Sequence, residues 1–199
     1  MLNYLKAHIM KNIAILASGS GTNAENIIKY FSNSNSAEVA LVLSNKRDAY
    51  VLERAAKHGI PAGFFDRAQF YSTGEVLNRL LAAQIDFIVL AGFLWLVPKE
   101  IIEAYPRRII NIHPALLPAY GGKGMFGEHV HEIVIKNGDR ESGITIHYVN
   151  EVYDSGDVIL QVRCRVEGND TAESLAHRVH QLEYRYFPEV IKKLVEEIA

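Results

Sequence analysis

The chain has 199 residues, of which 49% are hydrophobic and 22% are charged, and its formal net charge is −2. This composition is typical of a globular protein and excludes the disordered, collagen-like and fibrous classes. A chain of this length buries enough surface to be stable without disulfides or a structural metal, and its single cysteine favours a reducing compartment. The balanced charge gives no global field for nucleic acid or an anionic membrane, so small molecules are the expected partners.

Residues 1–9 are expected to be an N-terminal extension, and residues 10–199 a single domain. Met10 is followed closely by the first apolar run, as at a natural start. No segment reaches the ~20 apolar residues of a membrane span, and the N-terminus lacks the apolar core and cleavage site of a signal peptide. These features predict a cytoplasmic protein, and they leave monomer and homodimer open.

Short apolar runs alternate with amphipathic segments over the first part of the chain. Runs typical of strands buried on both faces are expected at residues 13–17, 39–43, 63–65, 87–91 and 109–112. Apolar residues at helical spacing predict helices at 22–31, 51–56, 73–81 and 98–105. The first of these helices is expected to be capped by Thr22 or Asn23.

The remainder of the chain begins with an irregular loop rich in proline and glycine, residues 114–127, and such long loops are usually functional. A helix over 130–138, strands at 144–149 and 158–166, and a long helix from Thr171 are expected to follow. The alternation predicts an α/β fold: a doubly wound, mostly parallel sheet with helices on both faces. Ligands of such folds bind beyond the carboxyl ends of the strands.

A glycine-containing loop, Ser18-Gly19-Ser20-Gly21-Thr22-Asn23, joins the first strand to the first helix. Backbone amides at a helix N-terminus, approached closely through glycine, suit a phosphate group. The loop lacks the lysine of a P-loop and does not fit the dinucleotide-binding fingerprint. A phosphate site and a tight turn without a ligand are equally consistent with this motif alone.

Asn111 and His113 close the fifth predicted strand, and side-chain alternation places both on one side of it. An amide donor beside an imidazole suits a carbonyl reaction, in which an oxyanion develops and a proton moves. Asp154 lies in a glycine-containing turn, where aspartate is usually a turn former. Set against His113, its carboxylate would raise the pKa of the imidazole and orient a proton-carrying water.

Two further histidine pairs are expected to be unimportant for metal binding. His129 and His131 are expected at solvated positions near a helix start, with no ligand at a complementary spacing. His177 and His180 lie three residues apart on the C-terminal helix, where surface or site-rim positions are expected.

Several motifs that occur in order carry a family resemblance. They are the loop 18–23, Ser44-Asn45-Lys46, Ala91-Gly92-Phe93, Asn111-Ile112-His113-Pro114 with Leu116-Leu117-Pro118, and Asp154-Ser155-Gly156. Over residues 10–194 the chain resembles the folate-dependent formyltransferases. The form of the first loop favours the members of that family that act on glycinamide ribonucleotide.

The resemblance implies that 10-formyltetrahydrofolate, as co-substrate, gives its formyl group to the amine of glycinamide ribonucleotide in purine (IMP) biosynthesis, without a metal. It implies a catalytic set of Asn111, His113 and Asp154. Asn111 and protonated His113 would hold the formyl oxygen as it becomes an oxyanion. Asp154 would keep His113 charged and help move a proton from the amine to the departing folate nitrogen.

The resemblance also implies two binding regions. The ribonucleotide would contact residues of the first loop and the last helix, namely Gly21, Thr22, Asn23, His180 and Glu183. The folate would lie against Phe93, Leu94, Trp95, Leu96, Val97, Ile109, Asn150, Glu151, Val152 and Tyr153. Trp95 and Thr73 stand where the family often has basic residues that reach the glutamate tail of the folate.

Three other functions stay open. A 10-formyltetrahydrofolate hydrolase would give the formyl group to water, and a sugar-nucleotide formyltransferase would use a different acceptor. A non-catalytic nucleotide-binding module would explain the glycine loop, but it would leave Asn111, His113 and Asp154 as unrelated coincidences.

Overall fold

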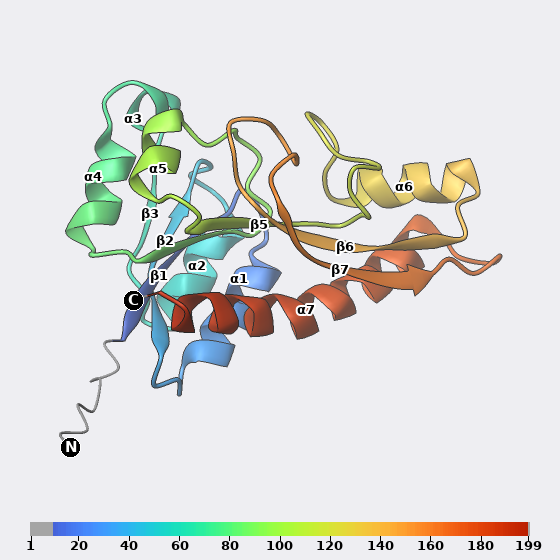
Figure 1. Cartoon of the computed structure of the whole chain (residues 1–199), viewed down its shortest axis with the longest axis horizontal. Coiled ribbons are helices and arrows are strands. Elements are labelled where there is room, and N and C mark those ends of the chain that lie inside the picture. Colours follow the sequence, from blue (N-terminus) through green and yellow to red (C-terminus); the bar gives the residue numbers. More distant parts are fainter. Residues whose placement is uncertain (1–9, 199) are drawn as a thin grey trace, which may run out of the picture.

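One mixed sheet runs through the centre of the molecule (Figure 1). A computed structural model describes residues 10–198, so the expected extension 1–9 lies outside the described residues. Within 10–198 the strands are β1 (Lys11–Leu16), β2 (Ala37–Ser44), β3 (Ala62–Phe64), β4 (Phe87–Leu90), β5 (Ile109–His113), β6 (Glu141–Tyr148) and β7 (Val158–Arg165). The helices are α1 (Thr22–Phe31), α2 (Tyr50–Lys57), α3 (Arg67–Tyr71), α4 (Glu75–Ala82), α5 (Lys99–Ala104), α6 (Glu128–Asn137) and α7 (Ala172–Glu196).

The strand order, β3-β2-β1-β4-β5-β6-β7, confirms the doubly wound arrangement. The pairs from β3 through β5 are parallel, whereas β6 and β7 are antiparallel to their neighbours. Strand order reverses at β1, which has β2 on one side and β4 on the other. Crossovers leave in opposite directions from this point, so a crevice opens at the carboxyl ends of β1 and β4.

Side-chain alternation along β1 divides the core into two layers. Ile13 and Ile15 enter a cluster that is shared with helices α1, α2, α6 and α7, whereas Ala14 and Leu16 enter a cluster with α3, α4 and α5. Figure 1 shows α7, in red, running along one face of the sheet, with α3, α4 and α5 gathered at one end. Both faces of the parallel strands are therefore covered, which is why their sequences read as continuous apolar runs.

The helix starts differ in part from expectation. Neither Thr22 nor Asn23 caps α1: Gly21 is the N-cap, in a left-handed conformation with φ 76°, and no side chain caps the helix. A Cβ at Gly21 would lie 2.5 Å from the side chain of Val51, so close packing of α2 requires glycine there. The expected cap of α7 is confirmed, because Thr171 and Ser174 form a reciprocal capping box.

Helix α3 was not anticipated from the apolar pattern. It has only five residues and starts with a capping box between Asp66 and Gln69, while Phe70 buries its ring in the core. Such a short helix shows too little periodicity to be recognised. No helix among the described residues has both the length and the apolar character needed to cross a bilayer.

A substitution at Phe187 tests how much α7 contributes to stability, because the Phe187 ring is fully buried in the core cluster between α7 and the sheet. Substitution Phe187→Ala removes that ring and leaves a cavity, so we expect the free energy of unfolding in urea to fall by about 3–5 kcal/mol. The matched control is Leu81→Ala on α4, whose side chain is exposed, with an expected change within about 0.5 kcal/mol. Equal losses in the two variants would contradict this account of the core.

Candidate active site

A cavity of about 870 Å³ opens at the carboxyl ends of β1, β4 and β5. Its wall comes from the loops that follow these strands, from the loop between β6 and β7, from the 122–127 segment and from α7. The position is that expected of a ligand site in a doubly wound sheet. The glycine-containing loop 18–23, the Asn111-x-His113 motif and Asp154, which the sequence analysis singled out separately, all contribute to this cavity.

The antiparallel pairing of β5 and β6 brings a second histidine to Asn111. In the register of these strands Asn111 lies opposite His147, and His113 lies opposite Thr145. The Nδ2 atom of Asn111 is 3.1 Å from Nε2 of His147. Thr145 is buried and holds the chain after His113 through hydrogen bonds with the backbone of Ala115 and Leu117.

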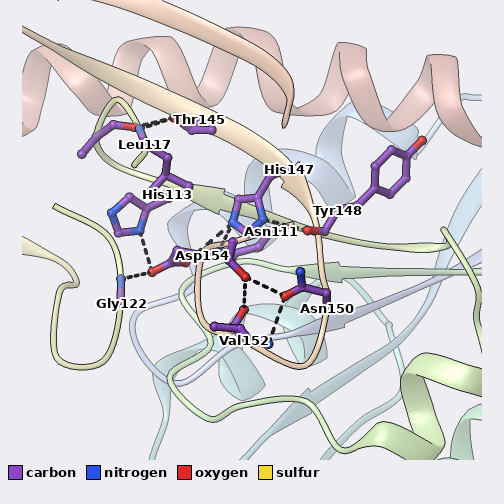
Figure 2. A network of polar contacts seen from close by, with 12 residues as sticks. Asn111, His113, Leu117, Gly122, Thr145, His147, Tyr148, Asn150, Val152 and Asp154 are labelled. Atoms are coloured by element: carbon purple, nitrogen blue, oxygen red, sulfur yellow. Dashed lines mark hydrogen bonds and ion pairs between the residues drawn. The ribbon is translucent and has the colours of Figure 1, made fainter. Parts of the chain in front are cut away.

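Asp154 is the centre of the polar network, as Figure 2 shows. Its Oδ1 accepts a hydrogen bond from Asn111 Nδ2 at 3.3 Å and lies 3.6 Å from His147 Nε2. Its Oδ2 accepts from the Gly122 amide at 2.8 Å and lies 3.6 Å from His113 Nδ1. One carboxylate thus contacts β5, β6 and the loop over the cavity.

The turn that carries Asp154 is tightly constrained. Asp154 itself has a φ of 51°, which aspartate tolerates better than most residues. A Cβ at Gly156 would lie 1.8 Å from the carbonyl oxygen of Tyr148. Only glycine allows this close approach, so the spacing of the Asp-x-Gly motif has a steric cause.

The charge state of Asp154 follows from its contacts. Burial by itself raises the pKa of this carboxyl, but the contact with His147, the charge of His113 and the hydrogen bond from the Gly122 amide outweigh burial and hold its pKa below the usual range. Asp154 is therefore ionised near neutral pH.

His113 is buried, and its two ring nitrogens face different partners. Nε2 lies 2.6 Å from the carbonyl oxygen of Tyr120, which only accepts, so Nε2 carries a proton. Burial lowers the pKa of His113 below its ordinary value, while Asp154 and the Tyr120 carbonyl act in the opposite direction. Tyr120 is held in turn by hydrogen bonds of its hydroxyl with Asn137 and Asp139. Nδ1, which faces Asp154 without a hydrogen bond, is the ring atom available for proton movement.

The glycine loop forms a second wall of the cavity, at the N-terminus of α1. Gly21, Thr22 and Asn23 all line it. Buried Ser18 anchors the start of the loop, because its hydroxyl donates to Asn45 at 2.7 Å and accepts from the Leu94 amide at 3.0 Å. The motifs at residues 18–23 and 44–46 are thus parts of one structure, and the N-terminus of α1 lies at the cavity wall.

A polar cluster joins the glycine loop to α7. Glu183 is buried, and its Oε2 accepts hydrogen bonds from Asn23 Nδ2 and from His180 Nδ1, both at 2.8 Å. The bond to Glu183 raises the pKa of His180 above its ordinary value. His180 is partly exposed at the rim of the cavity, as expected, and His177 is exposed outside it.

The expectation for His131 is wrong. It is not solvated but 1% exposed, and it lines the cavity next to the ring of His180. Burial, followed by the nearby charge of His180, lowers its pKa to about 4. His129 does lie at a solvated position, where it pairs with Glu132. The two histidines differ because side chains two residues apart on a helix point in different directions.

The residues expected to hold a flat folate ring divide into two groups. Phe93, Leu94, Trp95, Leu96 and Tyr153 line the cavity. Val97 and Ile109 are instead buried in the core, and Asn150, Glu151 and Val152 lie outside the cavity wall. The Asn150 side chain holds the 150–155 turn by accepting from the Val152 amide and the Ser155 hydroxyl.

Aromatic rings form one end of the part of the cavity that residues 93–96 and Tyr153 line, which we call the aromatic slot. Trp95 packs against Phe65, Phe70 and Tyr71. The guanidinium of Arg67 lies 5.7 Å from the ring centre of Trp95 and 4.9 Å from that of Tyr71. Arg67 and Tyr71 line the cavity although no sequence motif singled them out.

Several residues of the site were missed by sequence reasoning: His147, Tyr120, Gly122, His131, Arg67 and Tyr71. His147 shares a face with Thr145 in an alternating strand, but only the antiparallel register places it beside Asn111. Tyr120 acts through its carbonyl and Gly122 through its amide, and a sequence carries no signal for backbone contacts. No group of three or more potential metal ligands occurs among residues 10–198.

Comparison with known proteins gives one consistent family. Residues 11–191 match the model of the formyl transferase family. The chain is 42% identical to the chloroplastic phosphoribosylglycinamide formyltransferase of Arabidopsis thaliana over 94% of this chain, and it spans 66% of that protein. It is 35% identical to phosphoribosylglycinamide formyltransferase of Bacillus subtilis, over 94% of this chain and 95% of that protein.

The solved structures that resemble this chain carry the same family names as the sequence relatives. Glycinamide ribonucleotide transformylase 1 from Symbiobacterium toebii superposes with a TM-score of 0.86 at 36% identity, covering 98% of this chain and 92% of that one. Phosphoribosylglycinamide formyltransferase from Bacillus halodurans gives a TM-score of 0.84 at 40% identity, covering 95% and 97% of the two chains. The chain spans about two thirds of the length of the plant relatives that it matches.

The depressed pKa of His131 predicts a loss of stability in acid. Between its ordinary pKa and about 4, the unfolded chain binds the proton that folded His131 does not, so stability falls as pH decreases through this window. The shift corresponds to about 3 kcal/mol. Urea unfolding of His131→Asn should show a decline between pH 6.5 and pH 4 that is shallower than that of wild type by about this amount.

Substitution His129→Asn, at the exposed histidine of the same helix, is the control and should follow the wild-type curve. Parallel pH curves for wild type and His131→Asn would show that His131 is not held neutral by the fold.

Proposed function

Because the chain belongs to the formyl transferase family, we propose that it transfers the formyl group of 10-formyltetrahydrofolate to the amine of glycinamide ribonucleotide. The products are formylglycinamide ribonucleotide and tetrahydrofolate. One observation carries the proposal: Asn111, His113 and Asp154 converge in a cavity between a helix N-terminus and an aromatic slot. The names of the relatives support the choice of acceptor.

Transfer begins when the amine attacks the formyl carbon, and the formyl oxygen becomes an oxyanion. Asn111 Nδ2, which contacts His147 and Asp154 in this structure, exchanges one of these contacts for that oxygen and donates to it. Protonated His113 adds a second donor and a positive charge. Since Nε2 of His113 is already bonded to Tyr120, Nδ1 is the donor. Its separation of 3.6 Å from Asp154 leaves it free to be shared with the oxygen.

Asp154 then carries a proton from the amine to the folate nitrogen. Its ionised carboxylate stabilises the imidazolium of His113, which burial otherwise disfavours. The amine loses one proton and the folate nitrogen gains one as the carbon–nitrogen bond to the folate breaks. Asp154 takes the proton from the amine, directly or through a water, and passes it on to the departing folate nitrogen. His147, 3.6 Å from Oδ1, keeps the carboxylate in position. No covalent enzyme intermediate is required.

The two substrates occupy opposite walls. The amides at Gly21, Thr22 and Asn23 bind the phosphate of the ribonucleotide, since a helix N-terminus favours an anion. Glu183, with His180 beside it, accepts from the ribose hydroxyls.

The pterin of the folate lies in the apolar slot formed by residues 93–96 and Tyr153. The resemblance expects basic residues for the glutamate tail at the positions of Trp95 and Thr73. Trp95 lines the cavity and Thr73 does not, and Arg67 beside Trp95 supplies positive charge at that end. The cytoplasm and a monomeric or homodimeric state stay predictions of the sequence; the plant relatives are chloroplastic by name.

An absorbance assay with 10-formyltetrahydrofolate, with and without glycinamide ribonucleotide, tests the proposal. Loss of the formyl donor only when the ribonucleotide is present is the expected result. Loss without an acceptor would identify a hydrolase. Turnover with a sugar-nucleotide amine but not with glycinamide ribonucleotide would identify a different acceptor, and no turnover with any acceptor would leave a binding module.

The catalytic set makes a sharper prediction. Replacement His113→Ala removes the charge at the oxyanion, and Asp154→Asn removes the proton acceptor, so each should lower kcat by about 10²–10⁴-fold. Both substrates should still bind within a few-fold of wild type, as measured by equilibrium titration. Substitution His177→Ala, at an exposed histidine on α7, is the control and should keep wild-type turnover. Full activity of His113→Ala would overturn the assigned roles.

A further inference from the structure

We infer that Arg54 on α2 is a positioning residue for the glycine-containing loop 18–23: it fixes the peptide group between Ser20 and Gly21 so that the Gly21 amide is turned toward the cavity. The inference rests on the proposed function, which places the phosphate of the ribonucleotide at this loop, and deepens it. Arg54 itself lies outside the cavity wall, so it acts on the ligand through the loop.

Two consecutive carbonyl groups of the loop are bound from the side of α2. The backbone amide of Val51, in the first turn of α2, donates to the Gly19 carbonyl at 3.2 Å. Arg54, about one turn further along the helix, donates from Nε to the Ser20 carbonyl at 2.9 Å. Gly19, Ser20 and Gly21 all line the cavity. Both partners on α2 lie outside its wall, so the two carbonyls point away from the cavity.

The direction of these carbonyls sets the direction of the amides that follow. The peptide bonds after Gly19 and Ser20 are trans, and in a planar trans peptide the C=O and N–H bonds point in opposite directions. Carbonyls held toward α2 therefore turn the Ser20 and Gly21 amides toward the cavity. Neither amide has a hydrogen-bond acceptor among residues 10–198. Successive free amides of this kind form a concavity that binds anions, and this one adjoins the N-terminus of α1.

The side chain of Arg54 is itself held in place. Its guanidinium lies 4.9 Å from the ring centre of Tyr50. Nε binds the Ser20 carbonyl while Nη1 binds the carboxylate of Glu25, in the first turn of α1. A guanidinium carries several donors in one fixed plane, whereas a lysine amine offers a single point of contact. Arg54 therefore joins the loop to the helix whose N-terminus completes the anion site.

The charge of Glu25 is shared among several basic groups. Besides Arg54, it pairs with Lys29 and His58, each at 3.3 Å. The hydrogen bond with His58 lowers the pKa of Glu25, and Lys29 and Arg54 act in the same direction. Lys29 stays beside this carboxylate when Arg54 is replaced, so part of the charge remains compensated. The contact with the Ser20 carbonyl is the one that Arg54 alone supplies.

Kinetics with the substitution Arg54→Met test the inference, because methionine keeps an unbranched stem and removes every donor. KM for glycinamide ribonucleotide should rise about 10-fold, the effect of about one lost hydrogen bond to a charged group. The kcat at saturation and KM for 10-formyltetrahydrofolate should stay within about twofold of wild type, because the catalytic set is unchanged. The control Lys57→Ala removes an exposed positive charge from the same helix and should leave all constants unchanged.

A second substitution separates the two contacts of Arg54. Glu25→Gln alone removes the negative charge and leaves the bond to the Ser20 carbonyl, so KM for the ribonucleotide should stay within about twofold of wild type. Arg54→Met combined with Glu25→Gln should keep the rise of about 10-fold, because the Ser20 carbonyl still lacks its donor. A return to the wild-type KM in the double variant would mean that Arg54 only offsets the charge of Glu25, and the positioning role would be wrong.

Inorganic phosphate supplies a readout that does not depend on turnover. It should raise the Tm of wild type and of Lys57→Ala, since a ligand that binds only the folded state stabilises that state. Arg54→Met should lose most of this shift. Where Arg54→Met proves too unstable to measure, Arg54→Lys provides the comparison: its single amine cannot serve both Ser20 and Glu25, so KM should rise in the same direction by a smaller factor.

The outcomes separate this inference from the proposed function. An unchanged KM for the ribonucleotide in Arg54→Met, or phosphate shifts equal to those of wild type, would overturn the role of Arg54 and leave the transferase standing. Wild-type protein without turnover would reject the transferase. The phosphate shifts of wild type and Arg54→Met would then still decide whether Arg54 orients the loop.

Discussion

The arrangement of the site depends on one buried carboxylate. Asp154 contacts Asn111, His113 and His147 and also accepts from the Gly122 amide, so a single charge connects two strands with the loop over the cavity. A buried charge is costly unless it is compensated on every side. These contacts stabilise the ionised carboxylate, and two of the groups that make them, Asn111 and His113, are the ones to which the proposed function gives catalytic roles. Gly156 allows the turn to approach Tyr148 closely enough to place the carboxylate there.

The switch from parallel to antiparallel pairing at β5 and β6 brings the contacts of Asp154 together. With β4 beside it, β5 ends at the crevice of a doubly wound sheet, as its parallel neighbours do. Strand β6 enters β5 from the opposite direction, and its register brings His147 to Asn111. The turn after β6 then returns to the same edge with Asp154. A wholly parallel sheet would place a crossover helix between consecutive strands, which would separate the residues that here lie in contact.

Much of the fold could be predicted, because the parallel strands carry a strong physical signal. Ile13–Leu16 and Phe87–Leu90 are buried on both faces, and such segments are continuously apolar. The placement of Asn111 and His113 on one side of the strand could also be predicted, because side chains alternate along a strand. Features that depend on packing between distant segments could not be predicted from the sequence. Gly21 replaces the expected side-chain cap because α2 leaves no room for a Cβ, and His131 is buried because α6 packs against α7.

The histidines show why position along the chain is a poor guide to chemistry. His113 and His131 are both buried at the cavity, and burial lowers the pKa of each, but their surroundings differ. Asp154 and a backbone carbonyl oppose the effect of burial on His113, so its ring is prepared to take a proton as negative charge develops nearby. His131 is buried and faces His180, and both effects lower its pKa and favour a neutral ring. Two buried histidines of one cavity therefore differ in how readily they take a proton, according to which charged neighbour the fold supplies.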